Sequence, residues 1–232
     1  MSENKIDLNW QHIDTVFLDM DGTLLDLAFD NYFWHEYVPL IYSKSKSIDH
    51  QKSKELLLAM YKSQRGNLSW YCTDYWTEQL DLNIVELKRQ IVTRVSLFPL
   101  VTEFLKCLKI SKKRVVLLTN AHMDSVDIKM EKTGIRPLFD RVITSHSYGH
   151  AKEHDAFWPI LAKDEKHSLA NTLLIDDNVS VLQAADRYGI KHLLSIEQPD
   201  TTLPKQDTQG FPALDGFHEI ISGLQAETQQ EC

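Results

Sequence analysis

Four short apolar runs constrain the fold more than any other feature of this sequence. They are rich in Val, Ile and Leu, and polar residues do not alternate with apolar ones within them. Strands that are buried on both faces of a parallel sheet have this character, whereas half-exposed strands alternate. The sequence therefore predicts a parallel sheet that is covered on both faces. The predicted strands are residues 15–19, 114–119, 141–145 and 171–176, with a weaker fifth candidate at 191–196.

Helical patterns lie between the predicted strands. Apolar residues recur at helical spacing in each of them, and Asn178 is a candidate N-cap. Gly134 and Gly189 follow two of the patterns, as residues that end helices often do. Strands that alternate with helices predict a doubly wound, Rossmann-like α/β fold. The helical segments are 99–110, 124–134 and 178–189.

The interval between the first two predicted strands interrupts this alternation. No segment from Leu27 to Leu97 is a convincing strand, and the interval contains four helical patterns, at 29–42, 49–64, 68–80 and 83–95. A crossover between parallel strands needs only about a dozen residues. We therefore expect an inserted helical cap. The predicted organisation is a catalytic core of residues 1–25 and 98–232 with a cap of residues 26–97.

Charge and cysteine content narrow the possible functions. The 232-residue chain has a formal net charge of -8, which argues against binding a nucleic-acid polymer or an anionic membrane. A phosphate-bearing small molecule stays compatible, because a metal ion can make a site locally positive. The sequence shows no signal-peptide pattern and no apolar run of transmembrane length. We therefore expect a cytoplasmic protein in which Cys72, Cys107 and Cys232 are reduced thiols.

Polar side chains follow each of the four main apolar runs. Open α/β sheets bind ligands at the carboxyl ends of their strands, so these polar groups are predicted to meet at one edge. A single polar strand end would mean little, but four of them define a site. The residues are Asp19, Asp21 and Thr23 after the first run, Thr119 and Asn120 after the second, Lys152 after the third, and Asp176 and Asp177 after the fourth.

The residue types at this edge favour phosphoryl chemistry. Hard oxygen ligands suit Mg²⁺, and Mn²⁺ can substitute for it. An aspartate such as Asp19 can attack phosphorus to form an aspartyl-phosphate. Mg²⁺ and Lys152 would offset the charge of the nucleophile and of the phosphate. Thr119 and nearby backbone N–H groups can hold phosphate oxygens, and Asp21 can transfer the proton.

Four motifs support this reading. The sequence reads DMDGT at 19–23, LLTN at 117–120 and IDDN at 175–178, and Lys152 lies between the last two. In this order and spacing the motifs resemble those of the haloacid-dehalogenase-like phosphatase superfamily. The resemblance covers nearly the whole chain. It implies a phosphomonoester hydrolase with Mg²⁺ as its cofactor and a cap of the C1 type.

The resemblance also implies roles for individual residues. Asp19 is the implied nucleophile and Asp21 the implied general acid and base. Thr119 and Lys152 are implied to act on the phosphate. Within the same motifs, the residues predicted to bind the substrate or its phosphate are Thr23 and Asn120.

The metal ligands implied by the resemblance come from the first and fourth motifs. Asp19, the backbone carbonyl of Asp21 and Asp177 would hold the ion, with Asp176 behind Asp177 or as an alternative ligand. Two positions depart from the family pattern. Ala151 stands where a proline often precedes the lysine, and Val181 stands where a further carboxylate is common.

A closer resemblance is to bacterial GMP/IMP nucleotidases of this superfamily. It is carried by segments 19–39, 68–80 and 117–122. It implies a purine 5′-mononucleotide as the substrate. Two alternatives stay open: a sugar-phosphate phosphatase or phosphomutase of the same fold, and a non-catalytic regulatory protein on that fold.

Aromatic residues and histidines in the chain each permit two readings. The cap aromatics could stack on a purine or form the core of the cap, and Asn31 could contact a base or ribose. His146, His150 and His154 have the spacing of helix-borne metal ligands, but Gly149 interrupts a helix there. His122 could face the pocket or be exposed at the start of a helix. The cap aromatics are Phe29, Tyr32, Phe33, Trp34, Tyr37, Trp70, Tyr71, Tyr75 and Trp76.

Overall fold

The structure, a computed structural model, describes residue 6 and residues 8–230. The expectation about a signal peptide rests largely on residues 1–5 and 7, which lie outside the described residues, as does Cys232. Cys72 and Cys107 are free thiols, as predicted. Within the described part of the chain, no helix combines the length and the apolar character needed to cross a membrane.

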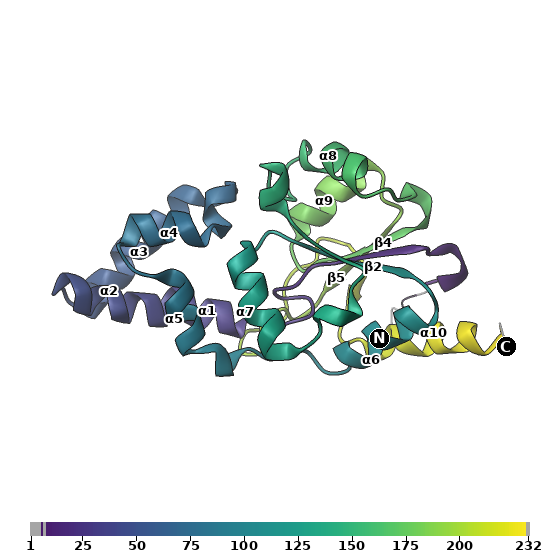
Figure 1. Cartoon of the computed structure of the whole chain (residues 1–232), viewed down its shortest axis with the longest axis horizontal. Coiled ribbons are helices and arrows are strands. Elements are labelled where there is room, and N and C mark those ends of the chain that lie inside the picture. Colours follow the sequence, from purple (N-terminus) through teal and green to yellow (C-terminus); the bar gives the residue numbers. More distant parts are fainter. Residues whose placement is uncertain (1–5, 7, 231–232) are drawn as a thin grey trace.

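A parallel sheet forms the centre of the molecule, and six strands of the described chain belong to it in the order β3-β2-β1-β4-β5-β6 (Figure 1). The predicted doubly wound α/β fold is confirmed. All five predicted runs form strands, whereas β6 was missed because two residues show no periodic pattern. The strands are β1 (Thr15–Leu18), β2 (Arg114–Thr119), β3 (Arg141–Thr144), β4 (Thr172–Ile175), β5 (His192–Ile196) and β6 (Ala213–Leu214).

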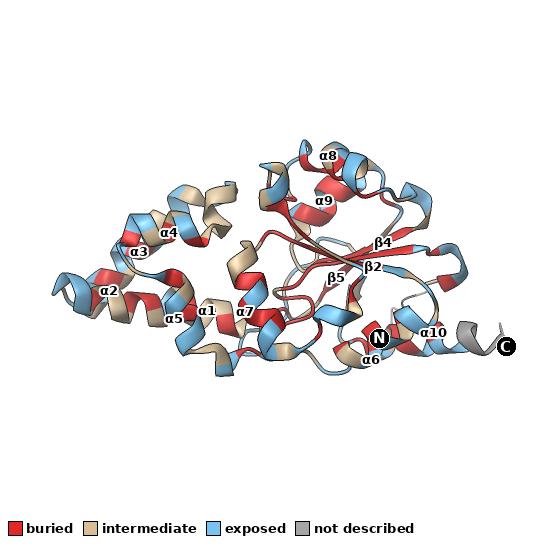
Figure 2. Cartoon of the chain, in the orientation of Figure 1, coloured by how far each residue is buried: buried red, intermediate tan, exposed pale blue. Residues whose placement is uncertain are grey.

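β1 lies in the middle of the sheet, between β2 and β4. Leu18 is in register with Leu117 of β2 and with Ile175 of β4. Successive side chains of a strand point to opposite faces, so Leu18 packs in one apolar cluster and Phe17 in another. Both side chains are fully buried. The strands of the sheet are largely buried (Figure 2), and burial on both faces explains why apolar and polar residues do not alternate in β1, where only Thr15 is polar.

Helices cover both faces of the sheet. One face packs against α6 (Val101–Ile110), α7 (Met123–Thr133) and α10 (His218–Gln230), and the other against α8 (Phe157–Asp164) and α9 (Val179–Tyr188). Figure 1 shows the two layers below and above the strands. The helices predicted at 99–110, 124–134 and 178–189 are present, and Asn178 caps α9 by accepting a hydrogen bond from the amide of Ser180.

A separate group of helices lies between β1 and β2 in the sequence and to one side of the sheet in Figure 1. It has an apolar cluster of its own, which includes Phe33, Leu57 and Trp76. The expected helical character of this block is confirmed. The elements are α1 (Ala28–Tyr32), the π-helix η2 (Phe33–Tyr37), α2 (Val38–Lys46), α3 (His50–Gln64), η3 (Leu68–Tyr71), α4 (Thr73–Leu80), α5 (Ile84–Gln90) and η4 (Val92–Arg94).

The chain leaves the sheet layer and returns to it at one place. Leu25 forms an antiparallel bridge with Leu97, and the amide of Asp26 donates to the carbonyl of Ser96 at 3.1 Å. Such a paired exit and entry is typical of an inserted unit. We propose on this basis that the boundaries of the cap are residues 26 and 97.

Phe17 offers a test of how the sheet is stabilised. Its side chain is completely buried and packs edge-on against the ring of His167. The variant Phe17→Ala leaves a cavity, so we expect the free energy of unfolding to fall by about 3–5 kcal/mol. Urea denaturation monitored by circular dichroism measures this change. Ile110→Ala is the control, because Ile110 is 64% exposed; a loss of equal size there would contradict the explanation.

Candidate active site

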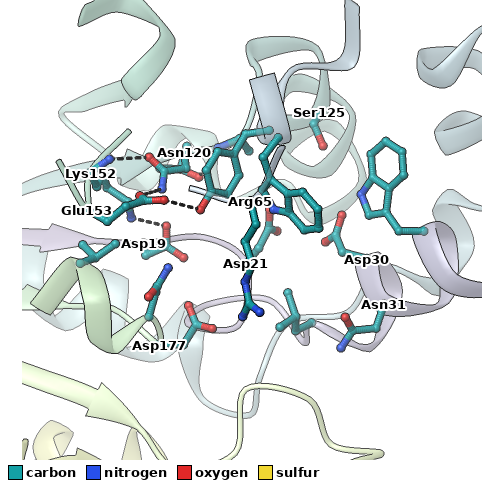
Figure 3. A pocket seen from close by; sticks show the side chains of 18 of the residues that line it. Asp19, Asp21, Asp30, Asn31, Arg65, Asn120, Ser125, Lys152, Glu153 and Asp177 are labelled. Carbon is teal, nitrogen blue, oxygen red and sulfur yellow. Dashed lines mark hydrogen bonds and ion pairs between the residues drawn. The ribbon is translucent and has the colours of Figure 1, made fainter. Parts of the chain in front are cut away.

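The polar residues at the strand ends come together as the sequence predicted. Asp19 follows β1, Thr119 ends β2, and Asp176 follows β4. Lys152 reaches the same place from the loop that follows β3. The crossovers run in opposite directions from β1 and β4, and open α/β sheets bind their ligands at such a switch point. All four side chains line one cavity, and Figure 3 shows Asp19 and Lys152 in it.

Lys152 lies at the bottom of this cavity with 1% of its side chain exposed. Its Nζ donates to Asp19 Oδ1 at 2.5 Å, to Asp176 Oδ2 at 2.6 Å and to the Leu118 carbonyl at 2.9 Å. All three protons of the ammonium group are therefore used. Burial acts to lower the pKa of Lys152, but the two carboxylates outweigh it and raise the pKa. Lys152 is therefore not a solvated surface lysine.

Three carboxylates surround this single ammonium group. Oxygen atoms of Asp19, Asp176 and Asp177 lie within 4.8 Å of one another. Burial raises the pKa of Asp19 to about 6, although Lys152 opposes it. Burial, followed by repulsion from the other two carboxylates, raises the pKa of Asp177 well above its usual value. Burial is the main cause of both shifts, and repulsion adds to it because one ammonium group faces three carboxylates.

The donor set of this cluster fits a hard divalent cation. It offers carboxylate oxygens without nitrogen or sulfur, which is the preference of Mg²⁺. Asp177 has no ion-pair partner among the described residues, whereas Asp176 is already paired with Lys152. The carboxylate of Asp177 is therefore the freer of the two to bind an ion.

The backbone around Asp177 is fixed by the first motif. Thr23 Oγ1 accepts a hydrogen bond from the Asp177 amide at 3.1 Å, and Gln206 Nε2 donates to the Asp177 carbonyl at 2.8 Å. Thr23 is fully buried and does not line the cavity. Gly22 has a φ of +83°, and a Cβ there would lie 2.5 Å from Asp177 Oδ2. A glycine at this position lets the two motifs come into contact.

Asn120 connects the lysine to the cap. Its Oδ1 accepts from the Lys152 amide at 2.9 Å, and its Nδ2 donates to Glu153 Oε2 at 2.8 Å. Glu153 Oε1 in turn accepts from the hydroxyl of Tyr71 at 3.0 Å. The hydrogen bond from the Lys152 amide to Asn120 fixes the backbone of Lys152. Ala151, in place of the more common proline, therefore does not displace the lysine. Thr119, which also lines the cavity, accepts from the amide of Ala121 at 3.1 Å.

Asp21 belongs to a different network from the other carboxylates. Its Oδ1 lies 2.7 Å from Lys129 Nζ, which also contacts Asp30 Oδ2 at 2.6 Å, and Asp30 Oδ1 lies 2.9 Å from Lys88 Nζ. Burial raises the pKa of Asp21 to about 6, and Lys129 opposes this shift. Burial acts to raise the pKa of Asp30 as well, but Lys129 and Lys88 outweigh it and lower the pKa to about 2.

This second network was missed by the sequence reading. Lys129 lies within an amphipathic helix and Lys88 within a cap helix, where lysines are normally solvated. Both side chains are at most 3% exposed. The sequence of a single helix does not indicate that residues from another element will bury its lysines.

The cavity extends from the strand ends into the cap and has a volume of about 470 Å³. Phe29 and Phe33, from the predicted aromatic set, are buried in the apolar core. Asn31 lines the cavity and donates to Asp200 Oδ2 at 2.6 Å. Arg65, which sequence reading did not single out, also reaches the cavity (Figure 3). The aromatic residues that line it are Trp34, Tyr61, Trp70, Tyr71 and Trp76.

The histidines do not form the helical series that their spacing allowed. Residues Ser145–Tyr148 form a short 3-10 helix (η6) that ends at Gly149, so His146 is separated from His150 and His154. His146 packs instead against His122, with ring centres 5.0 Å apart. Burial, and then repulsion by His122, lower the pKa of His146 to about 4, so its ring is neutral near pH 7.

The sheet brings carboxylates and a lysine to one cavity beneath a helical insertion. This is the arrangement of an α/β enzyme whose carboxylate oxygens could hold a divalent cation. The chain belongs to the haloacid dehalogenase-like hydrolases, whose family model matches residues 13–189. The predicted superfamily is confirmed. The prediction of an enzyme is also confirmed, and the chain is a hydrolase.

Two bacterial relatives match nearly the full length of the chain. It is 38% identical over 219 residues to GMP/IMP nucleotidase YrfG of Escherichia coli (strain K12), a match that covers 94% of this chain and 99% of the relative. The protein of the same name from Shigella flexneri matches equally.

Solved structures show the same fold at low sequence identity. A HAD phosphatase from Thermococcus onnurineus superposes with a TM-score of 0.74 at 18% identity, over 90% of this chain and 97% of that chain. A predicted phosphoglycolate phosphatase from Haemophilus somnus 129pt gives 0.65 at 17% identity, over 91% and 97%.

Gly22 provides a test of the contact between the first and fourth motifs. In the variant Gly22→Ala, the new Cβ should push the Asp177 carboxylate away. The left-handed backbone conformation of the alanine should also lower the free energy of unfolding by about 1–2 kcal/mol. We expect a lower melting temperature and a smaller rise of that temperature when Mg²⁺ is added. Differential scanning fluorimetry across a Mg²⁺ titration measures both effects.

Gly134→Ala is the matched control for this variant. Gly134 has a φ of +69°, so alanine there should lower the stability by a similar amount, but no atom lies within 4 Å of its Cβ position. This variant should lose stability and keep the full response to Mg²⁺. An unchanged Mg²⁺ response in both variants would show that Gly22 does not position Asp177.

Proposed function

We propose that this hydrolase removes the phosphate from purine 5′-mononucleotides, with GMP and IMP as substrates and Mg²⁺ as cofactor. One observation carries the proposal: a single cavity joins the strand-end carboxylates and Lys152 to a group of aromatic side chains in the cap. The dimensions and lining of this cavity suit a molecule with a phosphate at one end and a flat ring at the other. The relationship to GMP/IMP nucleotidase YrfG supports the choice of substrate.

In the first proposed step, Asp19 attacks phosphorus. A bond forms between a carboxylate oxygen and phosphorus while the bond between phosphorus and the ribose oxygen breaks, which gives an aspartyl-phosphate. Asp21 gives its proton to the departing oxygen. Lys152 offsets negative charge beside the nucleophile, and the hydroxyl of Thr119 and neighbouring amides hold phosphate oxygens.

In the second proposed step, Asp21 accepts a proton from water, which attacks phosphorus and breaks the aspartyl-phosphate bond. Inorganic phosphate leaves and the Asp19 carboxylate is restored. When bound, Mg²⁺ would supply the positive charge that brings two anions together. Asp19, Asp177 and the backbone carbonyl of Asp21 would hold it, with Asp176 kept behind them by Lys152.

The cap end of the cavity would recognise the nucleoside. Stacking of a base on an aromatic ring contributes about 1–3 kcal/mol, and Trp34, Trp70 and Tyr71 are available for it. Arg65 lines this region and has no ion-pair partner among the described residues. Its guanidinium only donates hydrogen bonds, which suits the O6 and N7 acceptors of guanine and hypoxanthine. Adenine presents an amino group in place of O6.

The cap, residues 26–97, is proposed to open for substrate entry and to close for reaction. The hydrogen bond from Tyr71 to Glu153 and the ion pair between Asp30 and Lys129 join the cap to the core in the closed form. A nucleotide substrate and the free thiols of Cys72 and Cys107 support a cytoplasmic location.

The nucleophile can be tested with Asp19→Asn. The amide cannot form the acyl-phosphate, so kcat should fall by on the order of a thousandfold or more. The fold should stay intact, because the change removes one of three mutually repelling carboxylates and leaves Asp176 paired with Lys152. Phosphate release and thermal denaturation measure the two properties.

Asp14→Asn serves as the control for the nucleophile variant. Asp14 lies at the opposite end of β1, where its Oδ2 accepts from Asn171 Nδ2. This variant should retain wild-type turnover. Turnover by Asp19→Asn at a rate near wild type would eliminate Asp19 as the nucleophile.

The substrate can be tested by phosphate release from a panel of GMP, IMP, AMP, pyrimidine monophosphates and glucose 6-phosphate in the presence of Mg²⁺. We expect kcat/KM for GMP and IMP to exceed that for the pyrimidine nucleotides by about tenfold or more, because a purine has the larger stacking surface. AMP should be poorer than IMP if Arg65 contacts O6.

The other outcomes of the panel each exclude the proposal. Faster hydrolysis of sugar phosphates than of nucleotides would indicate the sugar-phosphate phosphatase of the same fold. No release from any nucleotide or from a generic aryl phosphate would indicate a non-catalytic protein.

A further inference from the structure

A second group of potential metal ligands lies at the rim of the cavity, where the cap meets the sheet. Cys72 immediately precedes α4 in the cap, His122 immediately precedes α7, and His146 lies in η6. One ligand atom from each residue lies within 4.8 Å of the other two. None of the three belongs to the carboxylate cluster or to the proposed hydrolytic steps.

His146 gives the clearest indication that something binds here. Its Nε2 atom is buried and has no hydrogen-bond partner among the described residues. Buried polar atoms nearly always have a partner, and an exception calls for an explanation. The neutral ring presents a lone pair, and the ring of His122 stands almost perpendicular to it, at 87°. A metal ion between the two rings and the thiol would satisfy this atom.

The surroundings orient the other two ligands. The amide of Tyr75 donates to Sγ of Cys72 at 3.4 Å, a bond that suits a thiolate. His122 Nδ1 lies 2.8 Å from the hydroxyl of Thr73 and 3.3 Å from a carboxylate oxygen of Asp124. Metal-bound histidines commonly hold their second nitrogen in this way. Nε2 of His122 is then left for an ion.

We propose that Cys72, His122 and His146 form a binding site for a zinc-class divalent ion. One thiolate and two imidazoles are the mixed donor set that Zn²⁺ prefers, and they differ from the all-oxygen set at Asp19 and Asp177. Asp74 Oδ2 lies 3.7 Å from His122 Nε2 but does not group with Cys72 and His146, so water would be the fourth ligand. Binding of the ion releases the thiol proton of Cys72 to solvent.

The geometry requires only small adjustments. Bonds of about 2.0–2.3 Å around a tetrahedral ion place its ligand atoms about 3.5 Å apart. The ligand atoms of the three residues lie within 4.8 Å of one another, so binding of an ion draws them together by at most about 1.3 Å. Because Cys72 belongs to the cap helices and both histidines follow strands of the sheet, a bound ion joins the cap to the core and favours the closed cavity.

Cobalt titration of the full-length protein tests the site independently of turnover and of the proposed substrate. The chain is first freed of metal and supplied with excess Mg²⁺, which occupies the carboxylate cluster. Added Co²⁺ should then produce a thiolate-to-cobalt charge-transfer band and strong visible bands of tetrahedral coordination, saturating at about one equivalent. Zn²⁺ should abolish these bands by competition and raise the melting temperature.

Variants distinguish the ligands from other metal-binding groups. Cys72→Ser should eliminate the charge-transfer band and weaken binding at least tenfold. His146→Leu should also weaken binding while keeping the fold, since it removes an unsatisfied buried atom. Cys107→Ser, at the second free thiol among the described residues, should keep the wild-type spectrum. Weak octahedral bands alone in the wild type, or an unchanged spectrum and affinity in Cys72→Ser, would overturn the proposal.

Discussion

The buried ammonium group of Lys152 is the interaction on which the site depends. It joins Asp19 at the end of β1 to Asp176 at the end of β4 and is anchored to the strand β2 through the Leu118 carbonyl. Loss of the lysine would leave Asp19 and Asp176 buried without a counter-charge, and breaking a buried ion pair in this way costs about 3–5 kcal/mol. One ammonium group cannot neutralise three carboxylates, so an excess of negative charge remains. That excess makes the strand tips suited to a divalent cation.

Much of this arrangement could be predicted from the sequence because it is encoded locally. The apolar runs specify buried parallel strands, and strands of one sheet deliver their polar ends to a common edge. The network of Lys129, Asp30 and Lys88 could not be predicted, because its burial arises from packing between separate elements. α8 was not predicted from the sequence either; its Pro159 lies in the first turn, where proline is tolerated.

The aromatic residues of the cap show the same division between local and tertiary information. Phe33 and Trp34 are adjacent in the π-helix η2, yet Phe33 is fully buried and Trp34 lines the cavity. The sequence favoured the core reading for any one aromatic residue, but it did not show which residues would contact a ligand. The helices that pack around η2 decide that Phe33 is buried in the core and that Trp34 faces the cavity.

Several of the contacts between cap and core near the cavity are polar. Tyr71 bonds to Glu153, Thr73 to His122 and Asp30 to Lys129. Polar interfaces of this kind can exchange their partners for water, so relative motion is the expectation. Lys129 makes this motion relevant to the proposed chemistry, because its ammonium is shared between Asp30 of the cap and Asp21 of the core. Opening of the cap would leave Asp21 as the remaining partner of Lys129, whereas closure divides that charge between two carboxylates. The environment of the proposed proton-transfer group is thereby tied to the position of the cap.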